Sequence, residues 1–116
     1  MQEVSSKITH KGKDYKLVFN LNVMERIQEE YGTLGAWGNM TDRSEGEVDI
    51  KALIFGITEM LNEGIEIDNE DNGTDEPLLT HKKVGRMLTD IGIDTAAAQM
   101  NGLVVESTKD DTGKNA

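Results

Sequence analysis

The amino-acid sequence predicts an α+β fold in which an N-terminal β-hairpin is followed by a bundle of four or five helices. Apolar residues alternate with a period of two in residues 5–19 and recur with helical spacing through most of the remaining chain. Glycine, proline and helix-capping residues separate these segments. The 116 residues make a single domain, because a second hydrophobic core would leave neither half enough apolar material.

The hairpin is expected between Ser5 and Phe19. Lys11-Gly12-Lys13 supplies its turn, since glycine adopts positive φ without a steric cost. The second arm is predicted to be the stronger strand because it is rich in β-branched and aromatic residues: Tyr15, Leu17, Val18 and Phe19.

Two short helices are expected next. Asn22 and Glu25 have the spacing of a capping box, so the first helix is predicted to begin there and to run to Tyr31. Gly32 follows as a residue that ends the helix with positive φ. Residues 33–40 are predicted to form a second, glycine-interrupted helix.

The strongest helical pattern begins after Asp49, a good N-cap, and is predicted to end at Gly64. Its apolar residues have the i, i+3, i+4, i+7 spacing of one helix face: Ile50, Leu53, Ile54, Ile57, Met60 and Leu61. Residues 65–76 are predicted to form an acidic loop that Pro77 closes.

Two further helices complete the bundle. Thr80 is predicted to cap a helix that Gly92 ends, and Asp94 to cap a last helix over residues 95–106. The folded domain is therefore assigned to residues 1–106. Residues 107–116 hold no apolar residue except the last, so a disordered tail is expected there.

The net charge of −10 is concentrated in residues 41–80, where twelve acids face only Arg43 and Lys51. Such a concentration indicates either a solvated loop or a surface that meets a partner. No basic stripe exists to neutralise phosphates, so no nucleic-acid binding is expected.

The chain has no cysteine, which excludes disulfides and thiolate chemistry and fits a reducing compartment. Residues 1–6 lack the apolar stretch of a secretory leader, and no apolar run reaches membrane-spanning length. We therefore expect a soluble cytosolic protein with no membrane partner.

No pattern indicates catalysis, a cofactor or a metal site. The chain has two histidines, His10 in a predicted strand and His81 at a predicted helix start, and a lone exposed histidine is far more often solvated than catalytic. Residues 68–74 resemble the start of a calcium-binding EF-hand loop, but Leu79 stands where the bidentate glutamate is needed. The sequence therefore favours a binding protein over an enzyme.

Three cationic or imidazole residues occupy the first turn of the helix that Thr80 caps: His81, Lys82 and Lys83. The helix dipole disfavours cations at this end. Either the nearby Asp75 and Glu76 compensate for them, or this end of the helix faces an acidic partner.

Seven apolar residues are candidates for a protein-binding or self-association surface: Trp37, Met40, Leu78, Leu79, Leu103, Val104 and Val105. Trp37 and Met40 lie in a glycine-interrupted segment, and residues 103–105 are consecutive on a helix, so they cannot all face one core. Packing of each group into the core is the alternative.

Residues 12–32, which read GKDYKLVFNLNVMERIQEEYG, resemble the opening of tail assembly chaperones from long-tailed phages and prophages of Gram-positive bacteria. In that family a short strand ending in an aromatic residue runs into a capped helix that closes on an aromatic residue and glycine. The later helices match in order, so the resemblance extends to about Gly92, although the acidic segment at residues 68–76 has no counterpart in it.

The resemblance implies a non-enzymatic chaperone of virion morphogenesis that works in the host bacterial cytosol. Its implied partners are the tape measure protein, a long and largely helical chain, and the tail-tube protein; self-association into a homo-oligomer is also compatible. Two alternatives remain: a structural tail or tail-completion component, and an acidic regulator that mimics DNA.

Overall fold

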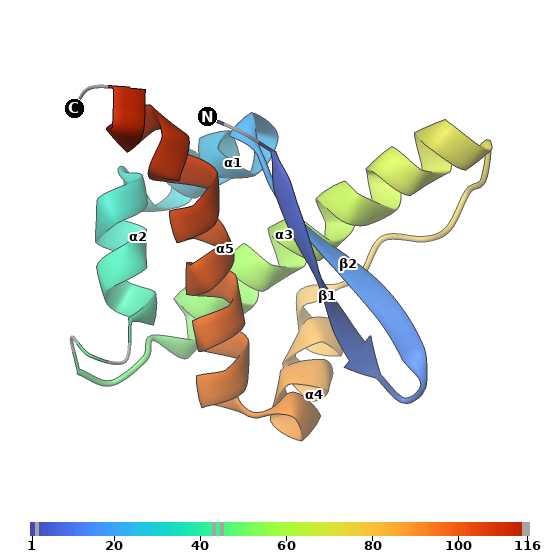
Figure 1. Cartoon of the computed structure of the whole chain (residues 1–116). Coiled ribbons are helices and arrows are strands. Elements are labelled where there is room, and N and C mark those ends of the chain that lie inside the picture. Colours follow the sequence, from blue (N-terminus) through green and yellow to red (C-terminus); the bar gives the residue numbers. More distant parts are fainter. Residues whose placement is uncertain (2, 43, 45, 115–116) are drawn as a thin grey trace.

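The computed structural model describes residues 1, 3–42, 44 and 46–114, with side chains placed as far as Lys109. The described residues form these elements in order: β1 (Val4–His10), β2 (Lys13–Phe19), α1 (Leu21–Tyr31), α2 (Leu34–Thr41), α3 (Ile50–Asn72), α4 (His81–Ile91) and α5 (Ile93–Lys114). The hairpin followed by a helical bundle confirms the predicted α+β fold (Figure 1). None of the described helices combines the length and the apolar character that crossing a membrane requires.

The hairpin has the predicted turn. β1 and β2 pair antiparallel with Val4 opposite Phe19, and Lys11 and Gly12 connect them. Both turn residues have positive φ, 51° and 77°, as a two-residue hairpin turn that follows the strand twist requires. Leu17, Val18 and Phe19 of β2 are all buried, so protein covers both faces of the strand where it ends.

Helix α3 is the element around which the other helices are arranged (Figure 1). It contacts β2 and each of the other four helices, while α5 packs on both strands of the hairpin. The core between these elements contains aliphatic side chains together with three methionines, Met60, Met87 and Met100. The last turns of α3 extend away from the other helices (Figure 1).

The start of α1 differs from the prediction by two residues. Asn20, and not Asn22, is the N-cap: its side-chain oxygen accepts a hydrogen bond of 3.2 Å from the backbone N–H of Val23. Asn22 instead lies in the first turn, where its amide donates to Glu63 of α3. The sequence offers two asparagines with nearly equal capping potential, and the contact with α3 separates their roles.

Helix α3 is eight residues longer than predicted, because it continues through Gly64 to Asn72. Gly64 serves close packing and does not end the helix: a Cβ added there would lie 2.7 Å from the backbone oxygen of Lys16 in β2. The helix ends at Gly73, which has left-handed backbone angles. The acidic loop predicted for residues 65–76 is therefore wrong for residues 65–72, which are helical.

Residues 73–80 form a strap that returns beside α3 to the start of α4. Two asparagines one heptad apart on α3 hold it through its backbone. Asn62 donates to the carbonyl of Leu79 and accepts from its N–H, at 3.0 and 2.8 Å. Asn69 makes the same pair of bonds with Glu76, at 3.0 and 2.9 Å. These bonds replace the backbone pairing that the strap would otherwise lack.

Helix α4 begins after Thr80 and ends before Gly92, as predicted. Helix α5 was predicted to end near Glu106, but its backbone remains helical to Lys114. Ser107 is buried and its hydroxyl donates to the carbonyl of Val104, 2.8 Å away, so polar residues there do not break the helix. Of the expected disordered tail, residues 115 and 116 lie outside the described residues.

Candidate partner-binding groove

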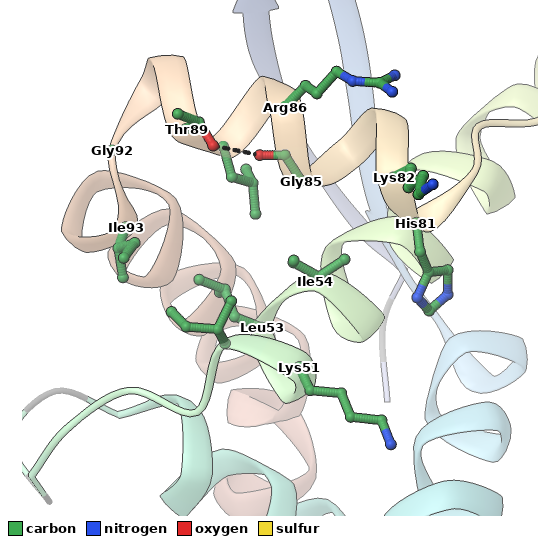
Figure 2. A pocket seen from close by; sticks show the side chains of 12 residues that line it. Lys51, Leu53, Ile54, His81, Lys82, Gly85, Arg86, Thr89, Gly92 and Ile93 are labelled. Atoms are coloured by element: carbon green, nitrogen blue, oxygen red, sulfur yellow. Dashed lines mark hydrogen bonds between the residues drawn. The ribbon is translucent and has the colours of Figure 1, made fainter.

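A groove of about 1020 Å³ lies between the first half of α3 and α4, with the start of α5 at one end. Figure 2 shows the two helices as facing walls. Twelve residues line it: Ile50, Lys51, Leu53, Ile54, His81, Lys82, Gly85, Arg86, Leu88, Thr89, Gly92 and Ile93.

The groove presents apolar side chains to solvent. Leu53 and Leu88 are buried in its floor, whereas Ile50 and Ile93 remain 45% and 41% exposed at its edges. Large aliphatic residues this exposed mark a surface that another apolar group can cover. The four come from α3, α4 and α5, so the fold and not any single helix assembles the surface.

Gly85 and Thr89 keep their part of the α4 wall open and without a free polar group. Gly85 has no side chain, and a Cβ added there would contact Ile54 across the groove at 3.6 Å. The hydroxyl of Thr89 donates to the carbonyl of Gly85 at 2.8 Å, so it is already bonded within its own helix (Figure 2). The wall therefore offers shape and apolar contact.

The polar groups of the groove are cationic. Lys51 lies on the α3 side, and Lys82 and Arg86 lie one turn apart on α4. The protein has 22 acidic residues, yet none of those that the structure describes lines the groove. Within the described part of the chain, none of the three cations has an ion-pair partner.

His81 has a packing role at one end of the groove. Its ring meets Phe55 edge to face with 6.1 Å between centroids, and Phe55 in turn meets Tyr31 at 5.5 Å. This aromatic row joins α4, α3 and α1.

The seven apolar residues that the sequence nominated do not form this groove. Trp37 and Leu103 are buried, so the core-packing alternative holds for these two, and they cannot present a surface in this fold. Leu79 and Val104 are partly buried against the core. Met40, Leu78 and Val105 are exposed, but they belong to α2, the strap and α5 respectively.

The groove was not predicted from the sequence, where the apolar stripe of α3 was recognised only as one helix face. The available signal was the width of that stripe: Ile50 and Ile54 lie on the α4 side, and Ile93 follows the break at Gly92. The charge pattern of the helix that begins at His81 was a second signal, because His81 and Lys82 of its first turn line the groove.

The acidic segment does not form a calcium loop. Asp68, Glu70 and Asn72 are helical, and Asp68 forms an ion pair with Lys16 at 2.9 Å. Among the residues that the structure describes, no three metal-binding side chains gather at one point.

The shifted pKa values have local causes. A hydrogen bond from Thr9 lowers the pKa of Asp14, and one from His10 lowers the pKa of Asp90. Burial raises the pKa of Tyr31. Each shift is explained by the contacts of the residue itself, so none of them indicates a catalytic pair.

Comparison of the chain with protein-family models, with curated proteins and with solved structures gives no significant match.

Proposed function

We propose that this protein is a non-enzymatic chaperone of phage tail assembly that holds helical segments of the tape measure protein in the groove between α3 and α4. The observation that carries the proposal is the exposed apolar surface of Ile50 and Ile93, with the partly buried Ile54 in the same groove between two helix walls. An amphipathic helix laid into such a groove buries one apolar face against another.

The resemblance of residues 12–32 to tail assembly chaperones supports the choice of client. A long helical client with exposed apolar stripes aggregates unless those stripes are covered. In this role the protein acts in the bacterial cytosol, presents the covered client to tail-tube subunits and then departs.

One observation bears on the acidic DNA-mimic alternative. A DNA mimic needs negative charges along a rigid face. The segment at residues 65–72 meets this requirement better than the predicted loop would, because it is helical. However, three of the carboxylates along α3 already contact polar residues of the same chain: Glu59 pairs with Arg26 at 3.5 Å, Glu63 accepts from Asn20 and Asn22, and Asp68 pairs with Lys16. This engagement leaves fewer charges free to imitate phosphates, and we favour the chaperone.

The proposal is tested by co-expressing the chain with the long helical protein that we expect to be encoded downstream of it. The expected result is that the helical protein is soluble with the chain and insoluble without it, and that purified tails lack the chain. Finding the chain in finished tails would favour a structural component instead. Solubility that does not depend on the chain would contradict the proposal.

A further inference from the structure

We infer that the groove between α3 and α4 selects amphipathic helices whose apolar stripe is flanked by Asp or Glu. The inference rests on the proposed function in one respect, because it takes the groove to be a helix-binding site. It adds the chemistry by which one helical segment is preferred over another.

The first argument is the segregation of charge. In a chain with net charge −10, this apolar groove is lined by Lys51, Lys82 and Arg86 and, among the described residues, by no carboxylate. Three acids adjoin lining residues in sequence: Asp49, Asp90 and Asp94. Asp49 accepts a 3.0 Å hydrogen bond from the backbone of Ala52, Asp90 pairs with His10 at 2.7 Å, and Asp94 lies in the first turn of α5. The groove is therefore locally positive on an acidic protein.

The second argument is that the two cations on α4 are unfavourable for the isolated protein. Lys82 lies in the first turn, where the helix dipole repels it, and Arg86 follows at i+4, where like charges repel. Among the described residues, no ion pair relieves either of them. An acidic group on a bound helix would supply the missing counter-charge.

Neither Asp75 nor Glu76 lines the groove. Lys83 and Glu76 both line a different cleft, between the strap and β2. Lys82 points to the groove instead, on the other side of α4. The compensation expected from these two acids therefore does not reach the groove wall.

The third argument concerns the kind of ligand. The groove lacks the convergent polar groups by which a small-molecule site fixes its ligand, because Thr89 is bonded to its own helix and Gly85 has no side chain. Its cations are on long side chains along two walls. This arrangement suits an apolar stripe with acids on both sides, which is the geometry of a helix.

The experiment uses three synthetic helices of about 20 residues, long enough to populate the helix. They share one Leu stripe and differ only in the flanking residue, which is Glu, Gln or Lys. Dissociation constants are measured by fluorescence anisotropy at about 0.15 M salt, where charges beyond about 8 Å are largely screened. We expect the Glu helix to bind about tenfold more tightly than the Lys helix, with the Gln helix between them.

The protein variants locate the preference. Lys51→Glu with Arg86→Glu is expected to reverse the order of the Glu and Lys helices. Lys82→Glu should reduce the preference about threefold, whereas Lys83→Glu, the same change on the next residue, should leave it unchanged. Circular dichroism confirms that each variant is folded, and a Lys51→Gln, Arg86→Gln variant repeats the test without added negative charge.

Several results would overturn the inference. Equal binding of the three helices, with loss of all binding in an Ile50→Asp, Ile93→Asp variant, would leave the groove as a helix site without charge selection. Binding of none of them, while the long helical protein stays soluble with the chain, would refute the inference and leave the proposed function standing. Selective binding of the Glu helix, without any effect on the solubility of the long helical protein, would support the inference and refute the proposed function.

Two other occupants are distinguished in the same series. A wild-type dimer that Ile93→Asp converts to a monomer would assign the groove to a second copy of the chain. Binding to vesicles rich in anionic lipid, but to none of the helices, would assign it to a membrane surface. Either outcome contradicts the inference.

Discussion

The ring of Trp37 occupies the space that a side chain at Gly56 would need. A Cβ built on Gly56 would lie 2.3 Å from Cζ2 of Trp37, and the indole N–H donates to the carbonyl of Ala52, one turn earlier on α3, at 3.0 Å. The tryptophan of α2 is therefore set against the backbone of α3, and it is fully buried. This contact, together with that of Gly64 on Lys16, lets the neighbouring elements approach α3 closely.

Replacement of Gly56 by Ala is expected to destabilise the protein by about 3 kcal/mol, the upper part of the range for an overpacked core, because a rigid ring must move. Urea denaturation measures the change in the free energy of unfolding. Gly102→Ala is the matched control: it is also a helical glycine, but its added Cβ meets nothing within 4 Å. That variant should gain up to about 1 kcal/mol from helix propensity. A neutral or stabilising Gly56→Ala would show that Trp37 is not held against α3.

Gly64→Ala is expected to loosen the contact between α3 and the hairpin, since the obstructing atom is the backbone oxygen of Lys16. A backbone atom cannot rotate away, so a loss of about 2–3 kcal/mol is expected. Hydrogen exchange should show earlier opening of β2 and of residues 65–72. If Gly64 were a helix end, as its place in the sequence indicates, the same substitution would leave β2 unaffected.

Asn62→Ala removes both hydrogen bonds that hold the backbone of Leu79. A loss of about 1–3 kcal/mol is expected, because a partly buried N–H and C=O are left without partners. Asn72→Ala is the control, at an exposed position on the same helix. Equal thermal unfolding of the two variants would contradict the role given to Asn62.

The pair formed by His10 and Asp90 ties the hairpin to α4, with 2.7 Å between the ring Nε2 and the carboxylate. The hydrogen bond lowers the pKa of Asp90 in the folded state, so its contribution is present above the unfolded pKa of about 3.9 and is lost as the pH falls through the lower folded value. Asp90→Asn should therefore make stability less dependent on pH in the acidic range below the unfolded pKa. The expected change in stability is small because the carboxylate is exposed. Identical profiles of stability against pH for the wild type and Asp90→Asn would show that the hydrogen bond between His10 and Asp90 does not form in solution.

The sequence was sufficient for local features and insufficient for contacts between elements. The turn at Gly12 and the caps of α4 depend on nearby residues, so their patterns predicted them correctly. Gly64 was read as a helix end because glycine has that local meaning, whereas its role is set by β2, nearly fifty residues earlier in the chain. Trp37 was nominated as a surface residue because nothing near it in sequence reveals that Gly56 leaves room for its ring.

The groove was not predicted for the same reason: it depends on contacts between elements that are far apart in the sequence. The cations after Thr80 were recognised as unfavourable for an isolated helix, but their counterpart Lys51 comes from a helix thirty residues earlier. The groove exists only where α3, α4 and α5 meet, so no single stretch of sequence contains it.

The central claim is that the client lies in the groove between α3 and α4, and nuclear magnetic resonance tests it most directly. The isotope-labelled chain is titrated with a helical fragment of the proposed client, and the backbone amide shifts are mapped. The account predicts that the largest shifts fall on residues 50–54, 81–89 and 92–93, which line the groove, and that Val105 and Met40 change little. Shifts centred on Val105, Met40 or Leu78, with the groove unchanged, would contradict it.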